Sequence, residues 1–125
     1  MWGTQLSPSV VQIIQHVAAR LEALHAVGYV HRDLKPGNVM WLPRENRWAL
    51  IDFGSAARTG TRAPLSFTMK YAAPEVAAAA RAAHSTANAA EAVDAWGLGV
   101  LAFELLTGMP AFRPRCPETE VLSLP

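Results

Sequence analysis

The stretch of sequence that decides the fold is His31-Arg32-Asp33-Leu34-Lys35-Pro36-Gly37-Asn38, which is charged and contains a Pro-Gly pair. Before it, apolar residues recur at spacings of mostly three and four, which predicts a helix over residues 8–27 with one broad buried face. After it, two short apolar runs at residues 39–42 and 48–51 predict the strands of a β-hairpin. The charged stretch is therefore predicted to be a loop between a helix and a hairpin.

The rest of the chain divides into an irregular, an alanine-rich and an apolar part. Residues 54–72 are rich in Ser and Thr and show no apolar period, which predicts a long irregular loop, a kind that is usually functional or mobile. Residues 76–93 are dominated by alanine and fit either a helix or a low-complexity insertion, and we favour a partly ordered insertion. Residues 92–107 predict a helix that is apolar on nearly every side, which indicates a place at a domain centre with Trp96 and Phe103 in the core.

Composition excludes several classes of protein. The 125 residues include 51% hydrophobic and 17% charged residues, unlike a disordered chain. Eleven Lys and Arg against ten Asp and Glu leave a net charge of +1, which gives no basis for binding nucleic acid. The longest apolar run, residues 95–103, is about half the ~20 residues of a membrane span. With Cys116 as its lone cysteine and no signal peptide, the chain is expected to be intracellular and cytoplasmic, and its oligomeric state stays open.

Three further motifs stand in a fixed order after the charged loop. They are Asp52-Phe53-Gly54 after the second predicted strand, Ala73-Pro74-Glu75 after the irregular loop, and Asp94-Ala95-Trp96-Gly97 on the apolar helix. Together with the charged loop they resemble the protein kinase family, serine/threonine type, over residues 7–112. The resemblance implies that residues 31–38 are the catalytic loop and residues 54–72 the activation loop. It also implies a mainly α fold with a small β-hairpin, which is part of a kinase helical (C-terminal) lobe with the nucleotide-binding lobe absent.

The resemblance implies a catalytic and metal-binding set that suits phosphoryl transfer. Asp33 would accept the proton of the substrate hydroxyl, and the Lys35 ammonium would reach the transferring phosphate of ATP. Asn38 and Asp52 would hold Mg²⁺, which prefers oxygen ligands at a phosphate. ATP and Mg²⁺ are thus the implied cofactors, and a protein is the implied substrate.

The resemblance also implies residues that regulate or shape the site. Arg32 would pair with a phosphorylated activation loop, for which Ser66 is one candidate besides Thr59 and Thr61, although each hydroxyl is more simply an ordinary loop residue. Thr68 would hydrogen-bond toward the catalytic Asp and Lys, as in serine/threonine kinases. The residue before it is usually glycine in the family and is Phe67 here, which puts the local backbone in question.

Four residues are implied to have structural roles. His31 would pack near Phe53, and Asp94 would bind the backbone of the catalytic loop from the apolar helix. Glu75 pairs in the family with an arginine that has no match in this sequence. Three other histidines match no family partner and are expected at the surface or in helix packing: His16, His25 and His84.

The chain is accordingly predicted to be one partial kinase domain over residues 1–125, with a poorly ordered tail at residues 113–125. A Gly-rich phosphate loop and a lysine-bearing strand are not found before the catalytic loop. We therefore expect a serine/threonine protein kinase fragment that is inactive in isolation. The alternative is a non-catalytic kinase-like remnant that acts as a binding or interaction module.

Overall fold

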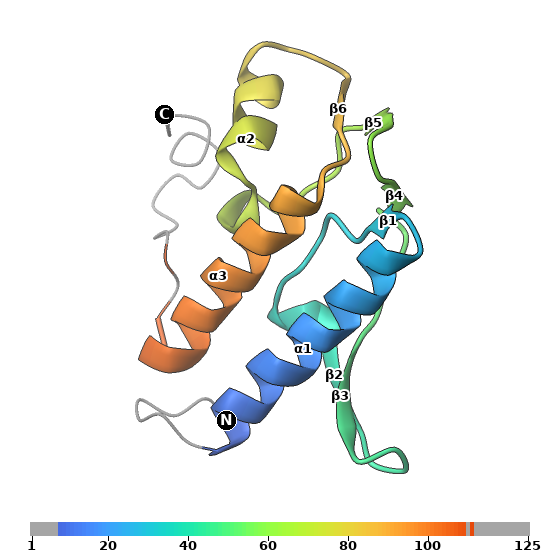
Figure 1. Cartoon of the computed structure of the whole chain (residues 1–125). Helices are drawn as coiled ribbons and strands as arrows, with labels where there is room; N and C mark the ends of the chain where they lie inside the picture. The colour runs from blue at the N-terminus through green and yellow to red at the C-terminus, as the bar shows by residue number, and fades with distance from the viewer. Residues whose placement is uncertain (1–7, 110, 112–125) are drawn as a thin grey trace.

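The computed structural model describes residues 8–109 and residue 111, and two long helices dominate it (Figure 1). The elements follow in chain order as α1 (Pro8–Ala26), β1 (Tyr29–Val30), the 3-10 helix η1 (Pro36–Asn38), β2 (Val39–Leu42), β3 (Arg47–Leu50), β4 (Ala57–Arg58), β5 (Arg62–Pro64), the 3-10 helix η2 (Met69–Tyr71), α2 (Pro74–Arg81), β6 (Thr86–Asn88) and α3 (Glu91–Thr107). The mainly α character and the small antiparallel hairpin agree with the prediction. The predicted tail at residues 113–125 lies outside the described residues.

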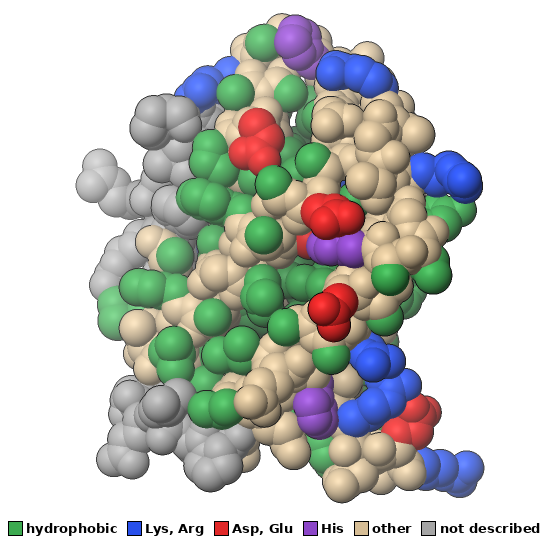
Figure 2. All heavy atoms as spheres, viewed as in Figure 1, with side chains coloured by type: hydrophobic (Ala, Val, Ile, Leu, Met, Phe, Trp, Pro, Cys, Tyr) green, Lys and Arg blue, Asp and Glu red, His purple; other side chains and the backbone are tan. Residues whose placement is uncertain are grey.

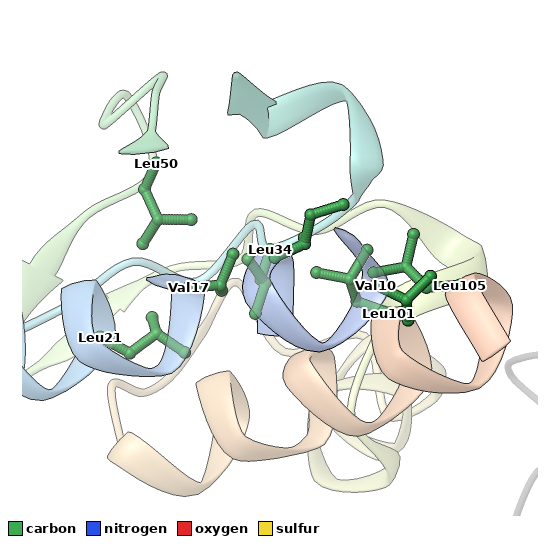
Figure 3. Close-up of a cluster of buried hydrophobic side chains, with 8 residues drawn as sticks. Val10, Val17, Leu21, Leu34, Leu50, Leu101 and Leu105 are labelled. Carbon is green, nitrogen blue, oxygen red and sulfur yellow. The ribbon is translucent and has the colours of Figure 1, made fainter. Parts of the chain in front are cut away.

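Helices α1 and α3 lie side by side and enclose the main core (Figure 1). The predicted apolar face of α1 is buried, because its residues at three- and four-residue spacings all point toward α3 and the catalytic loop. Figure 3 shows these side chains converging with Leu34 of the catalytic loop and Leu50 of β3. The buried members of this cluster are Val10, Ile13, Val17, Leu21, Leu34, Leu50, Leu101 and Leu105.

Glycines end both helices where the chain needs a left-handed backbone. Gly28 follows α1 with a φ of 88° and donates its N–H to the carbonyl of His25, and Gly108 caps α3 with a φ of 74°. Such angles strain any residue with a Cβ, which explains why glycine stops the helices here. Neither α1 nor α3, nor the short α2, is long and apolar enough within the described residues to cross a membrane.

Strands β2 and β3 form the predicted hairpin below the catalytic loop. Their antiparallel register pairs Val39 with Leu50 and Trp41 with Trp48, and the two indole rings lie 5.4 Å apart. The second strand spans residues 47–50, one residue earlier than the predicted 48–51, because the turn is one residue shorter than expected. The hairpin packs against α1, so the catalytic loop leaves one end of a rigid support.

The activation loop is only partly irregular. Its strand β4 pairs with β1, its strand β5 pairs with β6, and η2 lies near its end. The β5–β6 pair brings the loop to the alanine-rich segment, residues 76–93, which contains most of α2 and all of β6. Val76, Ala77 and Ala89 are buried, so the segment packs on its neighbours despite its simple composition. Whether it is an insertion relative to the family stays a prediction.

Helix α3 is buried on one side only, although its apolar composition predicted a place at a domain centre. Its inner side places Gly97 so close to the catalytic loop that a Cβ there would lie 3.1 Å from the Leu34 Cβ. Its outer side leaves Phe103 47% exposed, so the prediction of Phe103 as a core residue is wrong, whereas Trp96 is half-buried against α2. Figure 2 shows hydrophobic side chains gathered over this outer side. An apolar composition marks a helix that can be buried, but among the described residues α1, α2 and the loops leave its outer side uncovered.

Candidate active site

The buried carboxylate of Asp94 holds the beginning of the catalytic loop. It is 1% exposed, and its two oxygens accept hydrogen bonds from the backbone N–H groups of His31 and Arg32, both at 2.9 Å. Arg32 has a φ of 73°, a left-handed angle that is unfavourable for a residue with a side chain. The two hydrogen bonds offset this strain, because they give both backbone N–H groups an acceptor in a region shielded from water.

His25, at the end of α1, also binds Asp94, and the sequence prediction missed this contact. Its Nε2 lies 2.8 Å from Asp94 Oδ2, and its Nδ1 lies 3.7 Å from the Glu91 carboxylate. His25 was expected at the surface or in helix packing, and the structure gives it a specific polar partner instead; His16 likewise accepts a hydrogen bond at Nδ1 from the backbone N–H of Trp48. These partners lie 69 and 32 residues away in sequence, so no local spacing could reveal them.

Asp33, Lys35 and Thr68 meet in one hydrogen-bond network. The Thr68 hydroxyl donates to Asp33 Oδ1 at 2.9 Å and accepts from the Lys35 ammonium, also at 2.9 Å. The Lys35 Nζ lies 3.8 Å from Asp33 Oδ2. All three side chains are only partly buried, so they remain accessible from the surface. The network thus presents a carboxylate and an ammonium together, which can act on a hydroxyl and on a phosphate.

Asn38 and Asp52 lie next to each other across the end of the hairpin. The backbone carbonyl of Asn38 accepts a hydrogen bond from the N–H of Ile51, which directly precedes Asp52. The Asn38 amide donates from Nδ2 to the Asp33 carbonyl at 2.7 Å, which leaves its Oδ1 as the atom for a cation. Asp52 is exposed, and its Oδ1 accepts from the Gly54 N–H at 3.2 Å. The pair offers oxygen donors only, the chemistry that Mg²⁺ prefers when phosphates and water complete its shell.

No group of three or more His, Cys, Asp or Glu side chains gathers anywhere in residues 8–109, so a metal held by protein ligands alone has no candidate place there. An amide and a carboxylate that share the ion with phosphate oxygens do not need such a group. The donor set at Asn38 and Asp52 therefore fits a phosphate-bound Mg²⁺ and does not fit a structural zinc.

His31 and Phe53 connect the catalytic loop to the Asp-Phe-Gly motif. Their rings lie 5.3 Å apart in an edge-to-face arrangement, as the resemblance implies. The fully buried His31 ring also has its Nε2 3.0 Å from the Ile51 carbonyl and its Nδ1 3.1 Å from the Asp33 N–H. Asp33 and Asp52 are thus both attached to the same imidazole through backbone groups.

The Arg32 guanidinium binds backbone carbonyls of the activation loop. Its Nε donates to the Ser55 carbonyl at 2.7 Å and its Nη1 to the Pro64 carbonyl at 2.9 Å. Burial lowers the pKa of Arg32 from its ordinary value, and the nearby Asp94 carboxylate opposes that change. The Ser66 hydroxyl, named as a candidate phosphorylation site, lies 2.6 Å from the Ser55 hydroxyl.

Phe67 occupies the position where the family usually has glycine, and it packs on a second apolar cluster. This cluster consists of buried Ala72, Ala73, Val76 and Ala77 with Leu65, Phe67, Val93 and Trp96 around them. A pocket beside Asp33 is lined in part by the same residues. Phe67 thus anchors the backbone before Thr68 by apolar contact. Glu75, in the first turn of α2, is exposed and forms no ion pair within the described residues.

Tyr71 and Glu104 form a further contact that the sequence did not reveal. The Tyr71 hydroxyl donates to Glu104 Oε1 at 2.7 Å and so ties the end of the activation loop to α3. Burial raises the pKa of Tyr71, and the hydrogen bond and the charge of Glu104 act in the same direction. The signal in the sequence was Glu104, an acidic residue among the apolar residues in the second half of α3.

Comparisons with known proteins agree with this arrangement. A family model described as "Protein kinase domain" matches residues 5–122. The mouse protein "Serine/threonine-protein kinase SBK1" is 41% identical over 102 residues, which are 80% of this chain and 24% of that protein. The mouse "cAMP-dependent protein kinase catalytic subunit PRKX" is 40% identical over 97 residues, which are 77% of this chain and 25% of that protein.

A yeast relative gives a similar result. The "Aurora kinase" of Saccharomyces cerevisiae is 35% identical over 109 residues, which are 85% of this chain and 28% of that protein. The chain thus spans about a quarter of the length of the curated relatives it matches.

Proposed function

The chain belongs to the protein kinase family, and we propose that it carries the phosphoryl-transfer residues of a serine/threonine protein kinase, within the helical lobe of such an enzyme. The reaction would move the γ-phosphoryl group of ATP to a Ser or Thr hydroxyl of a protein. The observation that carries this proposal is the network in which Thr68 bridges the Asp33 carboxylate and the Lys35 ammonium.

Asp33 is the proposed base. Its carboxylate would orient the substrate hydroxyl and take its proton as the oxygen bonds to the γ-phosphorus and the bond to ADP breaks. The Thr68 hydroxyl donates to Asp33 Oδ1 at 2.9 Å and the Asn38 amide to Asp33 Oδ2 at 3.4 Å, so the carboxylate is held in one orientation. Such orientation matters because a small misplacement of the base lowers the rate sharply.

Lys35 is the proposed phosphate contact. Its ammonium is a compact cation, and Thr68 fixes it close to the Asp33 carboxylate. A charge held there can stabilise negative charge on the transferring phosphoryl group without reorganising during the reaction. A lysine two residues after the catalytic Asp, with a threonine at this position, supports a Ser/Thr rather than a Tyr substrate.

Asn38 and Asp52 are the proposed Mg²⁺ ligands, through Asn38 Oδ1 and the Asp52 carboxylate. When bound, the ion would neutralise phosphate charge. The protein's own part is to hold the two oxygens at the end of the hairpin, where Ile51 is bonded to both Asn38 and His31. This arrangement supports ATP with Mg²⁺ as the cofactor pair.

The alternative function is a kinase-like module that binds a partner without catalysis. The observation that favours it is the apolar surface on and just after α3, where Phe103 is 47%, Leu106 38% and Met109 44% exposed. Apolar side chains grouped in this way can form a contact with another protein surface.

A chimera distinguishes the two functions. The matching 102 residues of the mouse kinase SBK1 are replaced by those of this chain, and transfer of labelled phosphate to a generic protein substrate is measured with ATP and Mg²⁺. We expect transfer, with Asp33→Asn lowering the rate about 10²- to 10⁴-fold. The matched control is Glu45→Gln in the hairpin turn, which makes the same carboxylate-to-amide change away from the network.

The 125-residue chain alone serves as the reference, and we propose that it transfers little phosphate. A chimera that unfolds cooperatively at the temperature of the parent kinase yet transfers no phosphate would refute the catalytic proposal and leave the binding module. Equal rates for Asp33→Asn and Glu45→Gln would refute the role of Asp33.

A further inference from the structure

The activation loop and the alanine-rich segment form a longer ladder than the two short strands alone. The register of β5 and β6 pairs Arg62 with Asn88, Ala63 with Ala87 and Pro64 with Thr86. Backbone hydrogen bonds extend this ladder at both ends, from Gly60 N–H to the Ala89 carbonyl at 2.7 Å and from Leu65 N–H to the Ser85 carbonyl at 3.0 Å. Residues 60–65 are therefore paired along residues 85–89 over their whole length (Figure 1).

A side-chain contact locks the register of this ladder. The Arg62 guanidinium donates from Nε and Nη2 to the Thr86 hydroxyl, at 3.3 and 3.2 Å, and from Nη2 to the Thr86 carbonyl at 3.2 Å. A shift of one strand by one residue would place the two side chains on different faces of the ladder and break this contact. At the inner end, buried Ala89 also donates its N–H to the Thr61 carbonyl at 2.8 Å.

The same stretch is tied to the catalytic loop through Arg32. This guanidinium binds the carbonyls of Ser55 and Pro64, one near the beginning of the activation loop and one at the end of β5. The resemblance assigned Arg32 to a phosphorylated side chain, but two of its five N–H groups already bind carbonyls of the activation loop. The activation loop therefore has an ordered path in which Arg32 needs no phosphate.

We propose that residues 85–89 are an internal clamp, which holds the activation loop in its ordered path without phosphorylation, with Arg62 and Thr86 as its positioning residues. The clamp ends at Leu65, which is followed within three residues by Thr68, the residue that bridges Asp33 and Lys35. Its consequence for catalysis rests on the proposed function, because a fixed Leu65 keeps Thr68 within reach of both side chains. The ordering of the loop does not depend on that function.

The first test is hydrogen exchange of the 125-residue chain after phosphatase treatment. The amides of Gly60, Leu65 and Ala89 are followed, with those of Val17 and Leu101 as references for the α1–α3 core. We expect the three ladder amides to exchange at least about 10-fold more slowly than in an unstructured peptide. Fast exchange of these amides beside a protected core overturns the clamp, and so does protection that appears only after phosphorylation of the loop.

The second test is a double-mutant cycle of Arg62→Gln and Thr86→Val. Arg62→Gln removes all the hydrogen bonds of this guanidinium to Thr86, and Thr86→Val removes those to the hydroxyl. We expect each to speed exchange of the Leu65 amide about 2- to 10-fold, and the double variant to add little to the effect of Arg62→Gln. The control is Thr59→Val in the same loop, whose hydroxyl has no hydrogen-bond partner among the described residues. Effects that add in the double variant, or an equal effect of Thr59→Val, overturn the positioning role.

A stronger variant keeps the test decisive. Ala87→Pro removes a backbone donor from the middle of the ladder, and we expect Gly60 and Leu65 to lose more than about 10-fold in protection while Val17 and Leu101 keep theirs. An equal loss at all four amides would show that residues 85–89 support the core instead of the loop, and would overturn the proposal. Phosphate transfer is not measured in any arm, so failure of the clamp is distinct from failure of the proposed function.

Discussion

The catalytic loop and the activation loop are both irregular, yet different contacts hold them. The catalytic loop is attached to buried groups: Asp94 binds its first two backbone N–H groups, and Leu34 packs into the core against Gly97. The activation loop is attached mostly at half-exposed and exposed positions, through strand pairs and through hydroxyl contacts such as that of Ser55 with Ser66.

This difference separates two ways to position a site. A buried carboxylate that is lost leaves backbone donors unpaired in a dry environment, which costs much more than a lost contact near water. The catalytic loop should therefore be sensitive to single substitutions, and the activation loop should tolerate them and depend on its many pairs together. The two loops meet where Thr68 bonds to Asp33 and Lys35.

The largest effect is expected for Asp94→Ala. It leaves the N–H groups of His31 and Arg32 without their acceptor and should lower the free energy of unfolding by about 2–5 kcal/mol. The control Glu91→Ala removes the same charge from an exposed neighbour and should change little. Urea unfolding measures both, and equal losses would contradict the special role of the buried carboxylate.

The next effect is expected for Gly97→Ala. The added Cβ would lie 3.1 Å from the Leu34 Cβ, and overpacking should lower the free energy of unfolding by about 1–3 kcal/mol. Gly99→Ala on the same helix meets no atom within 4 Å and should stabilise by up to about 1 kcal/mol through helix propensity. The unfolding temperature should fall for Gly97→Ala and rise for Gly99→Ala. A rise for both variants would contradict the prediction, because it would show that Leu34 moves away from the added Cβ at little cost.

A smaller effect is expected in the activation loop for Ser66→Ala. The change removes the hydroxyl contact with Ser55, and we expect a loss of about 0.5–1.5 kcal/mol. Ser85→Ala is the control, because Ser85 joins the ladder through its backbone carbonyl. A loss in Ser66→Ala as large as in Asp94→Ala, measured by urea unfolding, would remove the contrast between the two loops.

The smallest effect is a pH dependence that stems from Tyr71. Its pKa is raised in the folded protein, so its stabilisation is fully present below the ordinary value of 10.0 and is lost as the pH rises above that value. We expect Tyr71→Phe to weaken the decline in stability above pH 10. Urea midpoints from pH 9 to 11 measure this, and parallel curves for wild type and Tyr71→Phe would contradict the shift.

Local patterns predicted the elements because their signals lie within a few residues. The apolar spacing over residues 8–27 predicted α1, and the two apolar runs around the hairpin turn predicted β2 and β3. Each predicted end lies within one residue of the observed end. The candidate catalytic residues Asp33 and Lys35 were named from the motif, and the structure brings both into contact with Thr68. The burial of α3 was overestimated, because composition reports what a helix can bury and not what covers it.

By itself the sequence determined the helices, the hairpin and the order of the motifs that identify the family, since periodicity, helix stops and short motifs are local. Only the tertiary structure decided that His25 meets Asp94 across 69 residues and that residues 60–65 pair with residues 85–89. The physical reason is that such contacts depend on where the packing of α1 on α3 brings distant segments. The paired residues include Ala, Pro and Asn, which are uncommon in strands, so the composition gave no signal for this ladder.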